Sequence, residues 1–444
     1  MRAWTSVAVL TVALSGGAQA DPLGEPPHPS SRAASEPGAV QLASVGVEKS
    51  LRPALRPSAT GQGEPAVQSG DSNQRFQNWI GAFKDRARSQ GISETVLEQA
   101  FDGVTYDADI IKRDRNQSEF TKTIWDYLDS AASETRIANG KASLAQHGRT
   151  LDAIEQRYGV EKEVVVAVWG LESAYGTYRG KTDIIRALAT LSFDARRSQF
   201  FEQQLIAALK ILQNGDTTPR KMTGSWAGAM GHTQFIPTSY LDYAVDFTGD
   251  GKRDIWSDDP TDALASTAAY LARFGWETGK PWGVEVRLPK GFDYRLADRK
   301  IERLPSDWAR LGVVSMAGQP VADHGAASVL LPAGGKGAAF LIFRNFSVIE
   351  RYNAADAYVI GVGHLSDRIK GGPAIQAAWP RDDRALTLKE RKEMQERLTA
   401  RGFDTQGVDG RIGPLTISAV RAFQVASGLT PDGYASLGLL NRLR

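Results

Sequence analysis

One stretch constrains the fold of this chain more than any other: Val164 to Gly176, which reads V-V-V-A-V-W-G-L-E-S-A-Y-G. The pattern predicts a helix that carries one carboxylate, Glu172, at the end of a strongly apolar run. At helical spacing, Val165, Val168 and Trp169 lie one or two turns before Glu172 on the same face. The final glycine of the stretch is well placed to end the helix in a left-handed cap.

An acid in such surroundings loses hydration in its charged form, so the pKa of Glu172 should rise. The group can then hold a proton near neutral pH, as a general acid must. A carboxylate that caps a loop or pairs with an arginine explains the same letters, because shifted carboxylates also occur in structural networks. On the spacing alone, the structural role is favoured.

A second block, Gly224 to Tyr240, reads G-S-W-A-G-A-M-G-H-T-Q-F-I-P-T-S-Y. Together with the E-S-A-Y-G of the helix, it resembles the lytic murein transglycosylases of the B type, lysozyme-like enzymes that cut the glycan strands of peptidoglycan. The resemblance runs from about Phe76 to Ile369, and the length of the second block makes it highly specific. In that family the glutamate of the E-[ST] motif is the only catalytic acid, so the resemblance assigns this role to Glu172.

The resemblance also implies a set of residues that line the saccharide groove. The planar guanidinium of arginine suits the carboxylates of a lactyl group or peptide stem, although an arginine pair usually lies on a solvated loop. Polar side chains can bond sugar hydroxyls, and tyrosines can stack on sugar rings. The structural alternatives are a close helix–helix crossing that needs the glycines of the second block, and tyrosines buried in the core. The expected set is Arg196, Arg197, Ser225, Gln234, Tyr270, Tyr352, Asn353 and Tyr358.

The letters D-F-T-G-D-G-K, from Asp246 to Lys252, resemble the start of an EF-hand calcium loop. Oxygen ligands at alternate positions and a glycine at the sixth let such a loop turn around a hard cation. In B-type enzymes a later aspartate completes the site, and the resemblance gives this role to Asp262, with Asp258 and Asp259 as competitors. The alternative to a metal site is a plain Asp-Gly turn. The resemblance implies a structural Ca²⁺ held by Asp246, Thr248, Asp250, Lys252 and Asp262.

The N-terminal part of the chain has the pattern of an exported protein. Residues 1–20 combine a positive start, a short apolar run and the small-residue site Ala18-Gln19-Ala20, which is typical of a signal peptide. No apolar stretch is long enough to span a bilayer, and the sequence contains no cysteine. We therefore expect a periplasmic protein that is not a lipoprotein. Residues 21–74 contain no aromatic residue and predict a disordered linker.

The body of the chain predicts a mainly α fold (α+β). Phe76, Trp79, Ile80 and Phe83 form the stripe of an amphipathic helix. Val284 to Leu288 and Ala339 to Phe343 look like strands of a small sheet. With the resemblance, the expected architecture is a lysozyme-like catalytic domain over residues 75–370.

The C-terminal residues predict a separate module after a linker at 371–385. Thr387 and Glu390 form the pattern of a capping box, and V-D-G-R-I-G-P starts a turn with proline at a helix start. The letters from Val408 to Gln424 resemble the peptidoglycan-binding domain of wall enzymes, which implies a three-helix unit over residues 386–444.

The net charge of +2 makes nucleic acid a poor first guess as a partner, and the five histidines show no metal-ligand spacing, which argues against a zinc hydrolase. The expected function is that of a lytic transglycosylase. It would cleave the β-1,4 bond between N-acetylmuramic acid and N-acetylglucosamine and leave a 1,6-anhydromuramoyl end. Glycan strands are the expected partner, with wall-synthesis complexes as further candidates. A non-catalytic wall-binding scaffold and a hydrolytic muramidase of the lysozyme type are the alternatives.

Overall fold

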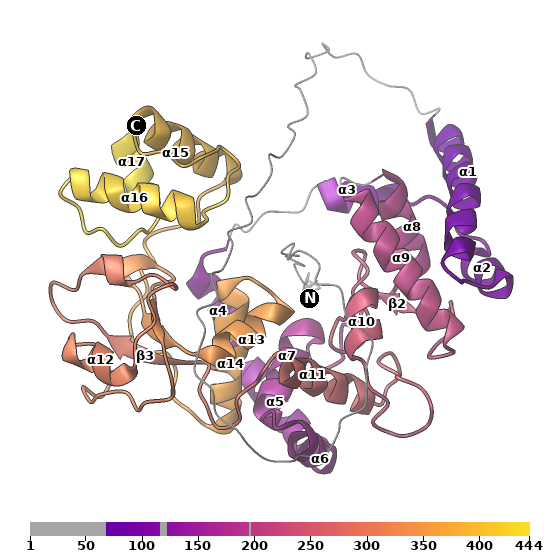
Figure 1. Ribbon diagram of the computed structural model, residues 1–444, viewed down its shortest axis with the longest axis horizontal. Helices are drawn as coiled ribbons and strands as arrows, with labels where there is room; N and C mark the ends of the chain where they lie inside the picture. The colour runs from indigo at the N-terminus through magenta and orange to yellow at the C-terminus, as the bar shows by residue number, and fades with distance from the viewer. Residues whose placement is uncertain (1–67, 116–121, 195–196) are drawn as a thin grey trace, which may run out of the picture. The chain divides into compact units, whose positions relative to one another are not determined.

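The computed structural model describes residues 68–115, 122–194 and 197–444 (Figure 1). The expected signal peptide and most of the expected linker lie outside the described residues. Helix α1 begins at Gln68, ahead of the expected boundary at 75. Once the apolar stripe has nucleated a helix, each further residue adds to it at little cost in free energy. Within the described ranges, no helix combines the length and the apolar character that crossing a membrane requires.

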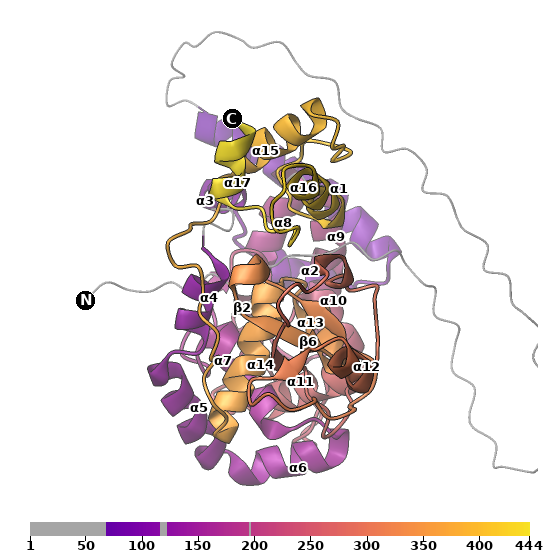
Figure 2. The same ribbon diagram turned by 90° about the vertical axis from the view of Figure 1, so that its left-hand side faces the viewer.

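Helix α7 (Lys162–Ser173) is the centre of the expected catalytic domain, and it packs against α5, α6, α11 and α14 (Figures 1 and 2). Every side chain from Val164 to Trp169 is buried, so the middle of the helix is enclosed on all sides. The surrounding helices are α4 (Ile124–Ala131), α5 (Glu134–Gln146), α6 (Gly148–Tyr158), α11 (Thr261–Arg273), α13 (Arg344–Tyr352) and α14 (Asp356–Lys370).

A second group of helices forms around the α8–α9 pair. The predicted stripe on α1 is confirmed: Phe76, Ile80 and Phe83 are buried, and the ring of Phe76 meets that of Phe193 at 5.5 Å. The members of this group are α1 (Gln68–Ser89), α2 (Glu94–Phe101), α3 (Ala108–Arg115), α8 (Ile184–Asp194), α9 (Ser198–Gln213) and α10 (Pro237–Tyr243).

A small antiparallel sheet follows, in the strand order β4-β3-β6-β5. Both predicted strands are present, and Val284 pairs with Leu341 in the register. A separate core around Trp308 and Phe292 covers this sheet. Its elements are β3 (Gly283–Arg287), β4 (Val314–Ser315), β5 (Ser328–Leu330), β6 (Ala339–Ile342), α12 (Pro305–Arg310) and the 3₁₀ turns η1 (Tyr294–Leu296) and η2 (Gly334–Lys336). A second pairing joins β1 (Thr182–Asp183) to β2 (Thr223–Gly224).

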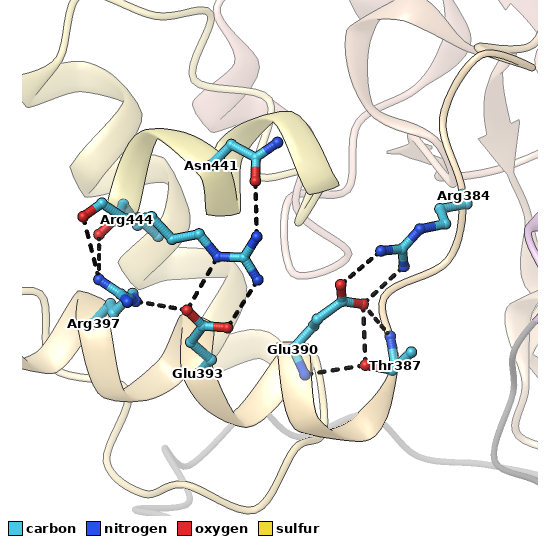
Figure 3. A network of polar contacts seen from close by, with 8 residues as sticks. Arg384, Thr387, Glu390, Glu393, Arg397, Asn441 and Arg444 are labelled. Carbon is cyan, nitrogen blue, oxygen red and sulfur yellow. Dashed lines mark hydrogen bonds and ion pairs between the residues drawn. The ribbon is translucent and has the colours of Figure 1, made fainter.

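Three helices form the C-terminal module: α15 (Leu388–Ala400), α16 (Pro414–Ala426) and α17 (Leu437–Leu443). The predicted capping box is confirmed (Figure 3): the Glu390 N–H donates to Thr387 Oγ1 at 3.2 Å, and the Thr387 N–H donates to the Glu390 carboxylate at 2.8 Å. Glu393 joins the two ends of the module, because both Arg397 of α15 and the terminal Arg444 donate to it (Figure 3).

The stretch between the two domains lies against the catalytic domain although it has no regular structure. The N–H groups of Gln376 and Ala377 donate to the Glu285 carboxylate on β3 at 2.9 and 2.7 Å. Further along, Arg381 pairs with Asp129 of α4 at 2.7 Å. These contacts hold the segment 371–383, called the strap below, against the catalytic domain.

Candidate active site

Glu172 lies in the last turn of α7, with its side chain partly buried. Its Oε1 accepts a hydrogen bond from the Tyr358 hydroxyl at 2.6 Å. Burial raises the pKa of Glu172 to about 7, and the bond from Tyr358 opposes this rise. No neighbouring charge among the described residues adds to the shift. The predicted rise in pKa is therefore confirmed, and its cause is desolvation.

Three tyrosines from three helices surround this carboxyl group: Tyr127 of α4, Tyr352 at the end of α13 and Tyr358 in the first turn of α14. For each, burial is the main cause and the Glu172 charge the next cause of a raised pKa, so all three hydroxyls stay protonated. Tyr352 donates to the carbonyl of Thr233 at 2.6 Å. Sequence reasoning missed Tyr127, because nothing in its local pattern sets it apart from a core tyrosine.

The end of α7 differs from the expectation. The predicted cap at Gly176 is wrong: the helix ends at Ser173, and Ala174 (φ 49°) is the left-handed cap, followed by Tyr175 at φ 58°. Left-handed conformations cost non-glycine residues roughly 1–2 kcal/mol each. Specific bonds offset this cost: the Tyr175 hydroxyl donates to the Arg136 carbonyl at 2.7 Å and the Gly176 N–H donates to Ser173 Oγ at 2.9 Å.

Two predicted groove residues, Ser225 and Gln234, hold the second sequence block together. Ser225 Oγ accepts the Ala229 N–H at 3.0 Å. Gln234 has a φ of 55°, and its amide nitrogen donates to the carbonyls of Gly231 and Arg179 at 2.8 and 3.0 Å. Ser225 thus bonds within the block, and Gln234 also joins the block to Arg179 in the turn that follows α7.

The remaining groove candidates fall into two places. Tyr270 of α11 is buried and contacts the ring of Tyr352 at 5.1 Å, and Asn353 Oδ1 accepts the Ala355 N–H at 3.1 Å in the α13–α14 corner. These residues support the corner that carries Tyr352 and Tyr358. Arg197 lies elsewhere, at the start of α9, where Nη2 is 3.8 Å from Asp114 Oδ1 of α3. Arg196 lies outside the described residues.

The calcium-loop residues come together around α11. Asp246, Asp250 and Asp262 each offer a carboxylate oxygen, and these oxygens lie within 4.8 Å of one another. Thr248 Oγ1 donates to Asp246 at 3.2 Å, and the Lys252 N–H donates to Asp250 at 2.9 Å. The competitors are elsewhere: Asp258 pairs with Arg179 at 2.8 Å and Asp259 bonds Thr261.

Asp262 shapes this loop from beneath. It is buried in the first turn of α11, and its carboxylate accepts the N–H groups of Phe247, Thr248 and Asp254 at 2.9, 3.1 and 3.0 Å. Burial raises the pKa of Asp262, and the nearby charge of Asp246 adds to the rise. Three carboxylates so close repel one another, and oxygen donors suit a hard divalent cation, so the residues present fit Ca²⁺.

Comparison with known proteins assigns both domains to known families. Residues 75–367 match the transglycosylase SLT domain, and residues 387–443 match the putative peptidoglycan binding domain. The membrane-bound lytic murein transglycosylase B of Escherichia coli K12 is 36% identical over 250 residues, which cover 55% of this chain and 66% of that protein, just under two thirds of its length.

Solved structures extend the comparison. SltB3 from Pseudomonas aeruginosa, in complex with NAG-anhNAM-pentapeptide, is 49% identical with a TM-score of 0.81, over 83% of this chain and 99% of that chain. Slt35 from Escherichia coli, in complex with calcium, is 30% identical with a TM-score of 0.57, over 67% of this chain and 93% of that chain. With the SLT match spanning the whole catalytic domain and a wall-binding module behind it, this chain belongs to the lytic transglycosylases of the B type.

Proposed function

We propose that this lytic transglycosylase cleaves the β-1,4 bond between N-acetylmuramic acid and N-acetylglucosamine and leaves a 1,6-anhydromuramoyl end. The observation that supports this reaction best is the environment of Glu172. Its carboxyl group has a pKa of about 7, raised by burial, and one tyrosine hydroxyl orients it at 2.6 Å. A non-catalytic scaffold has no need of a proton held in this way.

The reaction follows from one group that gives and takes back a proton. Protonated Glu172 donates its proton to the glycosidic oxygen while the bond from the muramoyl C1 to that oxygen breaks, which frees the 4-hydroxyl of the departing sugar. The Glu172 carboxylate then accepts the proton of the muramoyl C6 hydroxyl, and O6 bonds to C1. No water is consumed, and Glu172 ends in its starting state.

A second catalytic carboxylate is not required, because the acetamido group of the substrate can stabilise the cation at C1. The causes of the Glu172 pKa shift fit this view: within the part of the chain that the structure describes, they are burial and Tyr358 alone. A single acid of this kind serves either a transglycosylase or a hydrolytic muramidase, so the digestion products distinguish the two.

The test is digestion of purified peptidoglycan by the wild type and by Glu172→Gln, with products identified by mass spectrometry. General acid and general base steps each contribute about 10²–10⁴-fold, so Glu172→Gln should abolish turnover. Glu163→Gln, in the first turn of the same helix, is the matched control and should keep its activity. Products with hydrolysed reducing ends would identify a muramidase, and an active Glu172→Gln would remove Glu172 from the mechanism.

We also propose a structural Ca²⁺ held by Asp246, Thr248, Asp250 and Asp262, with Lys252 contributing through its backbone carbonyl. When bound, the ion would neutralise the clustered carboxylates and brace the loop before α11. The C-terminal module would retain the enzyme on the wall, and the periplasm, where peptidoglycan lies, is the proposed compartment.

A further inference from the structure

His232 joins two parts of the catalytic domain that are far apart in sequence. It lies in the second sequence block and its side chain is buried. Each of its four polar groups has a partner. Its N–H donates to the Ile255 carbonyl at 3.0 Å and its carbonyl accepts the Ser173 hydroxyl at 2.5 Å. In the ring, Nδ1 lies 3.1 Å from Trp169 Nε1, and Nε2 lies 2.7 Å from the Ser257 carbonyl.

These contacts select one form of the imidazole. The indole N–H of Trp169 is only a donor, so Nδ1 of His232 accepts, and the single proton of a neutral ring is on Nε2, which donates to Ser257. Arg179 Nη1 also lies 3.1 Å from Nε2, but its two N–H groups donate to the carbonyls of Trp256 and Ser257. The Ser257 carbonyl thus accepts from both Arg179 and His232. Burial is the main cause that lowers the pKa of His232, in agreement with a neutral ring.

Two of the four bonds hold α7 next to Glu172. Trp169 lies one turn before Glu172, and Ser173 is the residue that follows it. The last turn of a helix lacks intrahelical partners for its carbonyl groups, and here the chain leaves α7 through the left-handed Ala174. A Cβ on Gly176 would lie 2.6 Å from His232 Nδ1, so the imidazole also packs directly on the turn beyond the helix.

The other two bonds lead to the acidic loop. Ile255 and Ser257 belong to a turn in which the Asp254 carboxylate accepts the N–H groups of Trp256 and Ser257 at 2.9 and 3.1 Å. The Asp254 N–H in turn donates to Asp262 Oδ2 at 3.0 Å. A continuous series of hydrogen bonds therefore runs from Asp262 to the residues on either side of Glu172, and His232 is the member that joins the two halves.

We propose that His232 is a positioning residue, whose neutral imidazole clamps the last turn of α7 to the turn Asp254–Ser257 and thereby holds Glu172 in place for proton transfer. The inference rests on the proposed function of Glu172. A displacement of about 1 Å in a reacting group can cost on the order of 10²-fold in rate. His232 does not need to touch substrate to have an effect of this size.

The experiment compares kcat and KM on soluble glycan fragments for variants that remove the ring bonds separately. His232→Phe keeps a ring and loses both bonds; His232→Asn keeps an acceptor near Nδ1, and His232→Gln keeps a donor near Nε2. We expect kcat of His232→Phe to fall by about 10–100-fold with KM within two-fold. The Asn variant should recover part of kcat, because the Trp169 bond is the one closest to Glu172.

Trp169→Phe removes the same bond from the other side. It should lower kcat, and combining it with His232→Phe should lower kcat little further, because interactions within one pair are not additive. His364→Phe, at a buried histidine of α14, is the matched control and should leave kcat unchanged. The rise in Tm on addition of calcium should persist in every variant, which separates a displaced Glu172 from a disrupted acidic loop.

Three results would overturn the proposal: a kcat of His232→Phe within two-fold of the wild type, an equal loss in His364→Phe, or full additivity with Trp169→Phe. If His232→Phe does not fold, the Asn and Gln variants decide, since equal kcat loss in both contradicts a dominant Trp169 bond. Failure of the proposed function is seen separately, in wild-type products that carry hydrolysed ends or in an active Glu172→Gln. If the wild type proves to be a hydrolase, kcat of each His232 variant can still be compared with that of the wild type, so the positioning role remains testable.

Discussion

Replacing the catalytic acid should make the protein more stable at alkaline pH. Burial raises the pKa of Glu172 from 4.5 to about 7, so between these values the folded chain binds more protons than the unfolded chain. The free energy of unfolding therefore decreases as the pH rises through this window. Each pKa unit is worth about 1.4 kcal/mol, so ionised Glu172 costs about 3 kcal/mol above pH 7. Glu172→Gln removes this cost.

The assay is denaturant unfolding of the catalytic domain, followed by tryptophan fluorescence at pH 4.5 and pH 8. The difference in unfolding free energy between Glu172→Gln and wild type should grow by about 3 kcal/mol between these pH values. Taking the difference between the two pH values cancels any change in packing or hydrogen bonding that does not depend on pH. Glu163→Gln serves as the control. A difference that is flat with pH, or that grows toward acid, would refute the assignment of a raised Glu172 pKa.

Other perturbations test the rest of the site. Because the bond from Tyr358 lowers the Glu172 pKa, Tyr358→Phe should move the alkaline limb of the kcat–pH profile upward from about pH 7; an unchanged limb would contradict the role of this bond. Millimolar calcium should raise the Tm of the wild type by mass action. Asp250→Ala should lose most of this rise, whereas the control Asp382→Ala, at an exposed position, should keep it. A wild type whose Tm does not respond to calcium would exclude the site. Deleting residues 384–444, which spares the strap and its Arg381–Asp129 pair, should keep turnover of soluble fragments and weaken binding to sacculi; equal binding by both forms would assign the module another role.

Local patterns were enough to predict the elements that carry the site. The apolar run before Glu172 determines both a buried helix and a desolvated carboxyl group, because side chains three, four and seven positions apart share one helix face. The alternating aspartates and glycines of 246–252 bring carboxylates together within one loop, and Thr387 with Glu390 determines a capping box. In each case the interacting groups are close in sequence, so their spacing along the chain is enough to predict that they lie close together in space.

Tertiary structure decided what surrounds those elements. Tyr358 is 186 residues from Glu172 in sequence and reaches it only because α14 packs on α7. Tyr127 and His232 carry no local signal of their roles, since a tyrosine or histidine in a helical or turn pattern is equally at home in an ordinary core. The cap at Ala174 depends on distant partners, because Arg136 and His232 supply the contacts that hold a left-handed turn without glycine. A sequence pattern encodes which faces are buried; which polar groups then meet depends on how those faces pack.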